Sequence, residues 1–313
     1  MKTSRVLIIS SLILLASFLF FMLFNSNGNW DFILPFRGKK LLLLLTVAYT
    51  IGVSTLLFQT LTNNPILTPS ILGFDSLYLL LQTVLVFLLG GLGFTQLPIA
   101  NKFAFETLLM LGAALLLFRT LTKDNADIAR MLLIGVVFGV FFRSVNNLLQ
   151  RMIDPEEFAV AQSSSFASFN SANPILLTIG IIIALLSSIW IWTQRHKLDV
   201  LMLGKHKAIG LGINYNRFSH QLLICCALLV SVSTALVGPI LFLGLLVCAI
   251  VNSISPTMQH AIRIPLTFII SAITLVLGQA VFEQLFKLQG VLSVVIEFLG
   301  GIVFIYLMLK KQK

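Results

Sequence analysis

Few side chains in this sequence could carry out acid–base, nucleophilic or metal chemistry, and they are scattered. Arg143 and Glu297 lie inside long apolar stretches, and Glu106 and Glu283 lie near the ends of others. The sequence contains no GxxxxGK[ST], HExxH or GxSxG pattern. Its three cysteines and four histidines do not form ligand sets within the apolar stretches. We therefore expect that the chain is not itself an enzyme and that it holds no resident metal or cofactor.

The composition explains why such groups are rare. The chain has 313 residues, of which 58% are hydrophobic and 10% charged, whereas soluble domains carry about 25% charged residues. Apolar runs long enough to cross a bilayer recur throughout and must be helical in lipid. We predict an all-α, multi-pass membrane protein forming one domain, 1–313. The ten expected spans are 6–24, 41–61, 72–92, 104–118, 131–149, 174–194, 220–236, 239–254, 264–282 and 290–309.

The positive charges predict an orientation. If the N-terminus is cytoplasmic and the chain alternates, 14 of the 21 Lys and Arg residues fall in cytoplasmic segments. Both termini are then cytoplasmic. The first span has no A-x-A-like site after it, so we interpret it as an uncleaved span rather than a signal peptide. The net charge of +10 is a topology signal and does not indicate nucleic-acid binding.

A basic loop at 195–217 interrupts the apolar pattern. It contains Leu203-Gly204, Ala208 and Leu211-Gly212 in the spacing LGxxxAxxLG. On a helix, residues four apart share a face, so we expect a narrow face of small residues that another protein's backbone can approach. The alternative is a solvated positive loop that only orients the chain.

Two further segments predict helix breaks at or near membrane depth. They read NNPILTPSILG at 63–73 and VGPILFLGL at 237–245. Proline and glycine interrupt helices, and irregular backbone at this depth requires protein or a water-filled cavity beside it. The residues concerned are Asn64, Pro65, Pro69 and Gly73 in the first segment, and Gly238, Pro239 and Gly244 in the second.

Together the three segments resemble the FecCD-type permeases, the membrane subunits of ABC importers for iron-siderophores, haem and cobalamin. The family patterns NPLAxPxxLG, LGxxxAxxLG and GPIxFxGL correspond to 64–73, 203–212 and 238–245. The chain departs from the family at Cys248-Ala249, at 286–290 and at 300–302, which is typical of a divergent branch. The stretch 151–173 is similar to the second permease of importers for catecholate-type siderophores.

The resemblance implies a set of partners. Leu203, Gly204, Ala208, Leu211 and Gly212 would form the contact with a cytoplasmic ATPase. Two ATPase subunits would drive two permease subunits, as a heterodimer or, alternatively, a homodimer. A periplasmic or lipoprotein binding protein would deliver the ferric siderophore at a bacterial cytoplasmic membrane.

The resemblance gives a role to Arg37 and Lys40, and the charge of the expected substrate gives one to Arg143. Arg37 and Lys40 would project outward and pair with acidic residues of the binding protein; the alternative is a membrane-edge cation that reaches the headgroups. Arg143, with Asn146, Asn147, Gly238 and Pro239, would line the translocation pathway, because ferric catecholates are anions. Alternatively, Arg143 reaches the outer interface or pairs with Glu297 or Glu283.

Other functions stay open at this stage. An ion-gradient-driven transporter would have acidic residues along the midplane, which are nearly missing here. A membrane-embedded enzyme or scaffold would have a polar catalytic cluster, which the sequence lacks. Within the family, haem or cobalamin are alternative substrates, and the sequence does not name the siderophore.

Overall fold

The chain folds into a bundle of long helices. The computed structural model describes residues 3–24, 30–122, 128–163, 167–170, 173–285 and 292–311, and regular structure within them is helical. The α-helices are α1 (Thr3–Leu23), α2 (Trp30–Thr62), α3 (Phe74–Gln96), α4 (Ile99–Thr122), α5 (Ile128–Met152), α6 (Pro155–Ser163), α7 (Pro174–Thr193), α8 (Arg195–Leu201), α9 (Lys205–Gly210), α10 (Tyr215–Val237), α11 (Leu243–Ile254), α12 (His260–Ala280) and α13 (Leu292–Lys311). A 3₁₀ helix, η1 (Pro69–Leu72), precedes α3, and a π-helical turn, η2 (Val281–Leu285), follows α12.

Each predicted span corresponds to a helix, but one of them is too short. Seven described helices are long and apolar enough to cross a membrane, and α11 and α13 are shorter apolar helices. The expected span 239–254 is wrong at its start, because Gly238 has φ +99° and the helix begins only at Leu243. At 12 residues, α11 extends about 18 Å, less than the ~30 Å hydrocarbon core.

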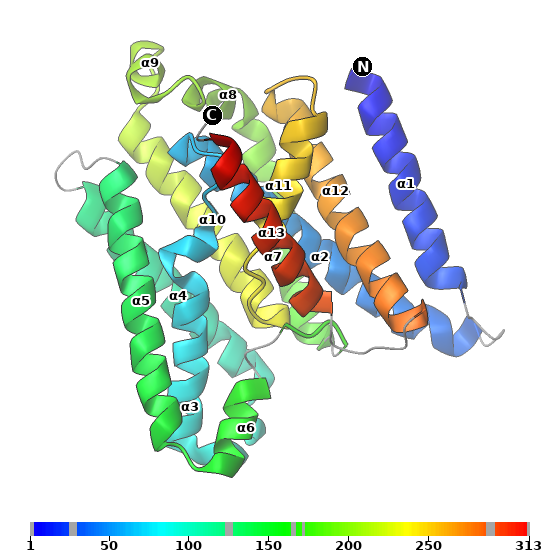
Figure 1. Cartoon of the computed structure of the whole chain (residues 1–313), viewed down its shortest axis with the longest axis vertical. Helices are drawn as coiled ribbons and strands as arrows, with labels where there is room; N and C mark the ends of the chain where they lie inside the picture. The colour runs from blue at the N-terminus through cyan, green and yellow to red at the C-terminus, as the bar shows by residue number, and fades with distance from the viewer. Residues whose placement is uncertain are drawn as a thin grey trace.

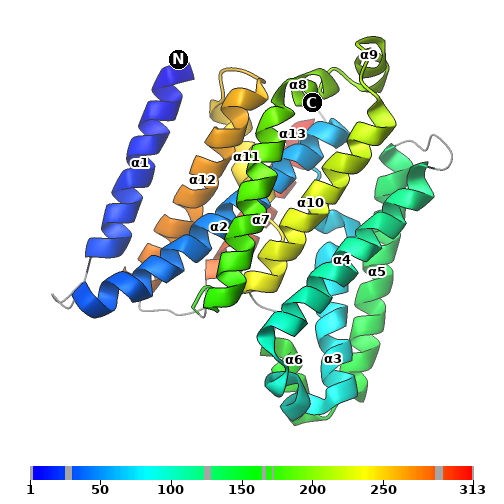
Figure 2. The ribbon, with the colours of Figure 1, turned by 180° about the vertical axis from the view of Figure 1, so that it is seen from behind.

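Helix α2 forms the centre of the bundle. It packs against α10, α12, α11 and α7, and α12 packs in turn against α1 (Figures 1 and 2). Helices α3, α4 and α5 pack together at one side, and α6 covers the end of α3 (Figure 1). Many apolar side chains of α1 and α5 are exposed, as expected for helices that face lipid or another subunit.

The two ends of the bundle differ. Helices α8 and α9 lie at the same end as both chain termini, whereas α6 and the start of α2 lie at the opposite end (Figure 1). The termini and the loop 195–217 therefore share one side, as the charge distribution predicts. That this side is the cytoplasm stays a prediction.

The break between α2 and α3 depends on local polar contacts and on glycine. Asn64 Oδ1 accepts a hydrogen bond from Ile66 N at 3.2 Å, and Gln59 Nε2 donates to Pro65 O at 2.7 Å. Pro69 begins η1, where its missing N–H costs nothing. Gly73 follows with φ +86°, and a Cβ there would lie 2.6 Å from Gly139 Cα.

The second break brings α11 close to α2. A Cβ added at Gly244 would lie 2.0 Å from Thr55 Oγ1, so only glycine allows this approach. Gly238 and Pro239 are buried. The second break therefore lies inside the protein, where neighbouring helices cover the irregular backbone. The first break begins at exposed residues, Asn63 and Pro65, and becomes buried at Thr68 and Pro69.

Candidate functional site

The segment 203–212 forms a helical corner at one end of the bundle, but its small residues do not share an exposed face. Gly204 (φ +94°) precedes α9 and Gly212 (φ +84°) follows it, so both lie outside the six-residue helix. Ala208 is fully buried in the chain's own core. The expected face of small residues is therefore wrong: the two glycines serve the backbone turns, and Ala208 lets α9 pack against the bundle.

The exposed surface of this segment is apolar at its centre and basic at its rim. Leu203, Ile209 and Leu211 are 51%, 51% and 62% exposed. Lys207 and Arg217 are also exposed. A groove of about 410 Å³ lies between α9 and the start of α10. An apolar centre bordered by charge is the usual anatomy of a protein–protein contact.

A polar chain ties this segment to the transmembrane helices. Asp199 Oδ1, on α8, accepts a hydrogen bond from the backbone nitrogen of His260. The same oxygen lies 2.7 Å from His260 Nδ1. On the other side of the ring, His260 Nε2 lies 2.8 Å from Thr60 Oγ1 of α2. His260 is fully buried. One side chain thus joins α8, α12 and α2, and sequence reasoning missed it because 61 residues separate Asp199 from His260.

A second contact reinforces the first. Arg263, one turn further along α12, donates to Asn252 Oδ1 of α11 and contacts Met202 Sδ at 3.6 Å. Arg263 is only 4% exposed. The C-terminal end of α8 is therefore held against both α11 and α12.

Arg37 and Lys40 differ from the expected outward pair. Arg37 Nη1 lies within 2.8–3.0 Å of the carbonyl oxygens of Phe21, Met22 and Phe24. Its cation therefore caps the C-terminal end of α1, where the helix dipole favours positive charge. Its role in binding-protein docking stays a prediction.

Lys40 is an internal residue. It is 5% exposed, and its Nζ lies 2.5 Å from Glu283 Oε2 and 2.8 Å from Asn170 Oδ1. The expectation that Lys40 projects outward is therefore wrong, because the ion pair holds its side chain inside the bundle. The alternative pairing of Arg143 with Glu283 is likewise not observed, since Glu283 pairs with Lys40.

The residues expected along the pathway separate into two groups. Arg143 and Asn147 are exposed and lie four residues apart on one face of α5. Asn146 is 6% exposed, and Gly238 and Pro239 are also buried. These three residues are therefore covered within the single chain, while Arg143 and Asn147 face its outside. The pathway role of all five stays a prediction.

The long apolar helices and the two helix breaks between them are the architecture of a multi-pass membrane permease. A model of the FecCD transport family matches residues 4–310. The chain belongs to this family.

Individual relatives agree with the family. The chain is 47% identical to the Petrobactin import system permease protein YclO of Bacillus subtilis (strain 168), over 93% of both chains. It is 33% identical to the Petrobactin import system permease protein FatC of Bacillus anthracis, over 88% of this chain and 78% of that one. A solved metal-chelate type ABC transporter in an inward-facing conformation shares the fold, with a TM-score of 0.86 at 20% identity, covering 99% of this chain and 100% of that chain.

Proposed function

We propose that this chain is a permease subunit of an ABC importer that moves a ferric siderophore of the petrobactin type across the bacterial cytoplasmic membrane. The observation that carries the substrate class is the 47% identity to YclO over 93% of both chains. The similarity to FatC supports the same class. In this proposal the chain has no ATPase activity of its own and works with a second permease, two ATPases and a binding protein.

The exposed corner around α9 is the proposed ATPase contact. Leu203, Ile209 and Leu211 offer apolar side chains that a cleft can bury, and Lys207 and Arg217 suit acidic residues at its rim. Asp199 and His260 then connect the docked segment to α2 and α12. A displacement of α8 reaches the transmembrane helices through this polar contact.

The exposed face of α5 is the proposed pathway surface. Arg143 lies there among exposed apolar side chains such as Val140 and Phe141. A cation at membrane depth is costly unless it faces water or a partner. A cavity between α5 and a second permease meets that requirement, and its positive charge attracts an anionic ferric chelate.

Uptake by cells tests the substrate class. In cells from which the gene for this chain is deleted, accumulation of ⁵⁵Fe supplied as ferric petrobactin should fall to background and return with the gene. Accumulation from a ferric hydroxamate should not change. Loss of hydroxamate uptake with petrobactin uptake intact would reject the proposed substrate.

Co-purification tests the docking surface separately. Ile209→Glu places a charge in the apolar centre and should abolish recovery of the ATPase with the permease. The matched variant Ile209→Val keeps the apolar surface and should recover the ATPase normally. Equal recovery with both variants would place the ATPase elsewhere.

A further inference from the structure

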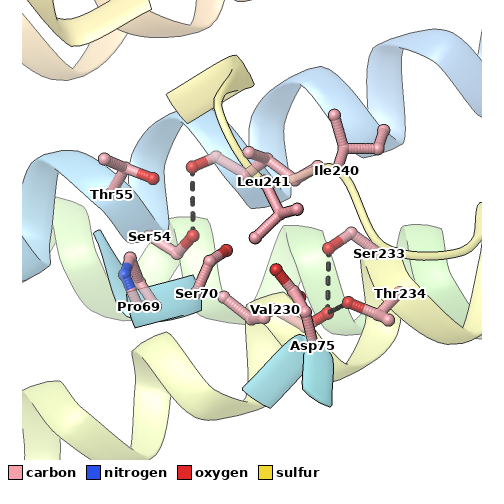
Figure 3. A pocket seen from close by; sticks show the side chains of 11 residues that line it. Ser54, Thr55, Pro69, Ser70, Asp75, Val230, Ser233, Thr234, Ile240 and Leu241 are labelled. Atoms are coloured by element: carbon pink, nitrogen blue, oxygen red, sulfur yellow. Dashed lines mark hydrogen bonds between the residues drawn. The ribbon is translucent and has the colours of Figure 1, made fainter. Parts of the chain in front are cut away.

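A small cavity lies where the two helix breaks meet. Figure 3 shows side chains from α2, η1, α3 and α10 and the segment 240–241 around it. Its volume, taken as the space open to the centre of a water molecule, is about 10 Å³. That is close to the minimum for one water-sized species.

Asp75 supplies a buried negative group to this cavity. It lies in the first turn of α3, is 5% exposed and lines the cavity (Figure 3). Its Oδ2 has no hydrogen-bond partner among the described residues. A buried carboxylate without full compensation is expensive, above all at membrane depth.

The charges near Asp75 favour its ionised form only in part. The N-terminus of α3 stabilises negative charge, and Arg143 on α5 attracts it through space. Glu297 on α13 acts in the opposite sense. Neither Arg143 nor Glu297 lines the cavity. No Lys, Arg or His side chain lines the cavity, so an ionised Asp75 has no cation beside it there.

Ser70 also lines the cavity, and its side chain is a hydrogen-bond partner of the Asp75 carboxyl group. Three other hydroxyl groups of the wall donate elsewhere. Ser54 Oγ donates to Ile51 O at 3.0 Å. Ser233 Oγ and Thr234 Oγ1 both donate to Val230 O, at 2.9 and 2.8 Å. The hydroxyl hydrogens of these three residues are thus committed to their own helices. These oxygens offer only lone pairs to the cavity.

We propose that Asp75 and the hydroxyl oxygens of Ser54, Ser233 and Thr234 bind one small monovalent cation, with Na⁺ as its probe. A cation accepts lone pairs from such oxygens and neutralises the carboxylate. A water molecule leaves the charge in place, and a proton on Asp75 provides only one donor. Mg²⁺ and Ca²⁺ favour more carboxylate and water oxygens than this small cavity offers.

The site goes beyond the proposed import function, because it concerns the assembly of the bundle and not the siderophore. One ion would link α2, α3 and α10 at the point where the backbone of the α2–α3 connection leaves the helix. Interrupted helices with unwound backbone at membrane depth are where transporters hold Na⁺.

Direct binding of ²²Na⁺ to the purified full-length chain in detergent tests the proposal. At constant ionic strength, set with choline chloride, we expect saturable binding of one Na⁺ per chain, displaced by unlabelled NaCl. Asp75→Asn keeps the shape of the side chain but removes its charge, and should abolish saturable binding. Ser233→Ala should weaken it.

Ser231→Ala is the matched control, because Ser231 is a fully buried serine of α10 that donates to Ala227 O and does not line the cavity. It should bind Na⁺ as the unmodified chain does. If Asp75→Asn does not yield folded protein by size-exclusion chromatography, the comparison of Ser233→Ala with Ser231→Ala decides. Absence of saturable ²²Na⁺ binding to the unmodified chain, or equal binding by Asp75→Asn, overturns the proposal in favour of a protonated carboxyl or a water.

Discussion

Buried partners decide what each polar residue of this chain can do. Arg37 and Lys40 occupy one stretch of α2 and look equivalent in sequence, but Arg37 caps α1 and Lys40 pairs with Glu283. Lys39, between them, is exposed. Of these three cations, Lys39 is therefore the most accessible to a partner, and Lys40 contributes to the stability of the bundle.

Replacing Lys40 with methionine should lower stability. Lys40→Met leaves Glu283 without its cation, and we expect the free energy of unfolding to fall by about 1–3 kcal/mol, less than for a fully buried pair. The effect is smaller because the Glu283 side chain is 27% exposed. The thermal midpoint of the purified chain measures the effect. Lys39→Met should leave the midpoint unchanged, and Lys40→Met combined with Glu283→Gln should recover part of the loss. If Lys40→Met does not lower the thermal midpoint, the Lys40–Glu283 pair contributes nothing to stability.

At this scale the sequence was a limited guide. Positive-inside counting marks Arg37 and Lys40 as unusual, but the partner of Lys40 lies 243 residues away along the chain. Local pattern carries no information on such pairings. Asp75 was overlooked for the same reason, since its cavity is assembled from four separate segments.

At the scale of elements, glycine and proline determine the helix boundaries, and these were readable from sequence. The breaks at 63–73 and 237–245 lie where the Pro and Gly residues predicted them. The small-residue pattern at 203–212 was misread, because spacing alone does not tell a glycine needed for close packing from one needed for positive φ. Gly204 and Gly212 are of the second kind.

Gly73 meets both requirements, so it should be the most sensitive glycine of the first break. Gly73→Ala combines a positive φ with a Cβ 2.6 Å from Gly139 Cα, and we expect at least about 2 kcal/mol of destabilisation. Gly112→Ala is the control, because its Cβ would meet no neighbouring atom within 4 Å. Thermal midpoints in detergent compare the two. A Gly73→Ala chain as stable as Gly112→Ala would show that the α3–α5 contact tolerates separation.

The Asp199–His260 contact should transmit movement between α8 and the transmembrane helices. Asp199→Ala should reduce ferric siderophore uptake while the ATPase still co-purifies, because the exposed surface around α9 is intact. A double-mutant cycle with His260→Ala should give a coupling energy of about 0.5–3 kcal/mol in stability. His196→Ala, at an exposed position of α8, should leave uptake normal. Strict additivity of Asp199→Ala and His260→Ala would contradict a direct link.

At the scale of the whole molecule, the sequence predicted an all-α membrane bundle of the FecCD type, and the family match over residues 4–310 confirms this. Hydrophobicity and length determine such a fold strongly. The surfaces that meet other subunits depend instead on which side chains a folded helix exposes. Ala208 and Asn146 were expected at partner or pathway surfaces and are buried.

The source of energy is the central claim at this scale. The described residues contain no group of three or more His, Cys, Asp or Glu side chains that could hold a metal ion, and the few acidic groups within the spans are separated. In the proposed function, ATPase partners bound at α8 and α9 supply the driving force, and membership of the FecCD transport family supports this. The cation proposed at Asp75 is a bound structural ion and does not drive transport.

Reconstitution in vesicles measures this claim most directly. The permease pair, its ATPases and the binding protein are placed in vesicles with ATP enclosed on the ATPase side, and ⁵⁵Fe-petrobactin is added outside. We predict accumulation that requires ATP, is lost with Ile209→Glu and does not change when Na⁺ and proton gradients are collapsed. Accumulation without ATP, driven by an imposed ion gradient, would contradict the assignment and identify an ion-coupled carrier.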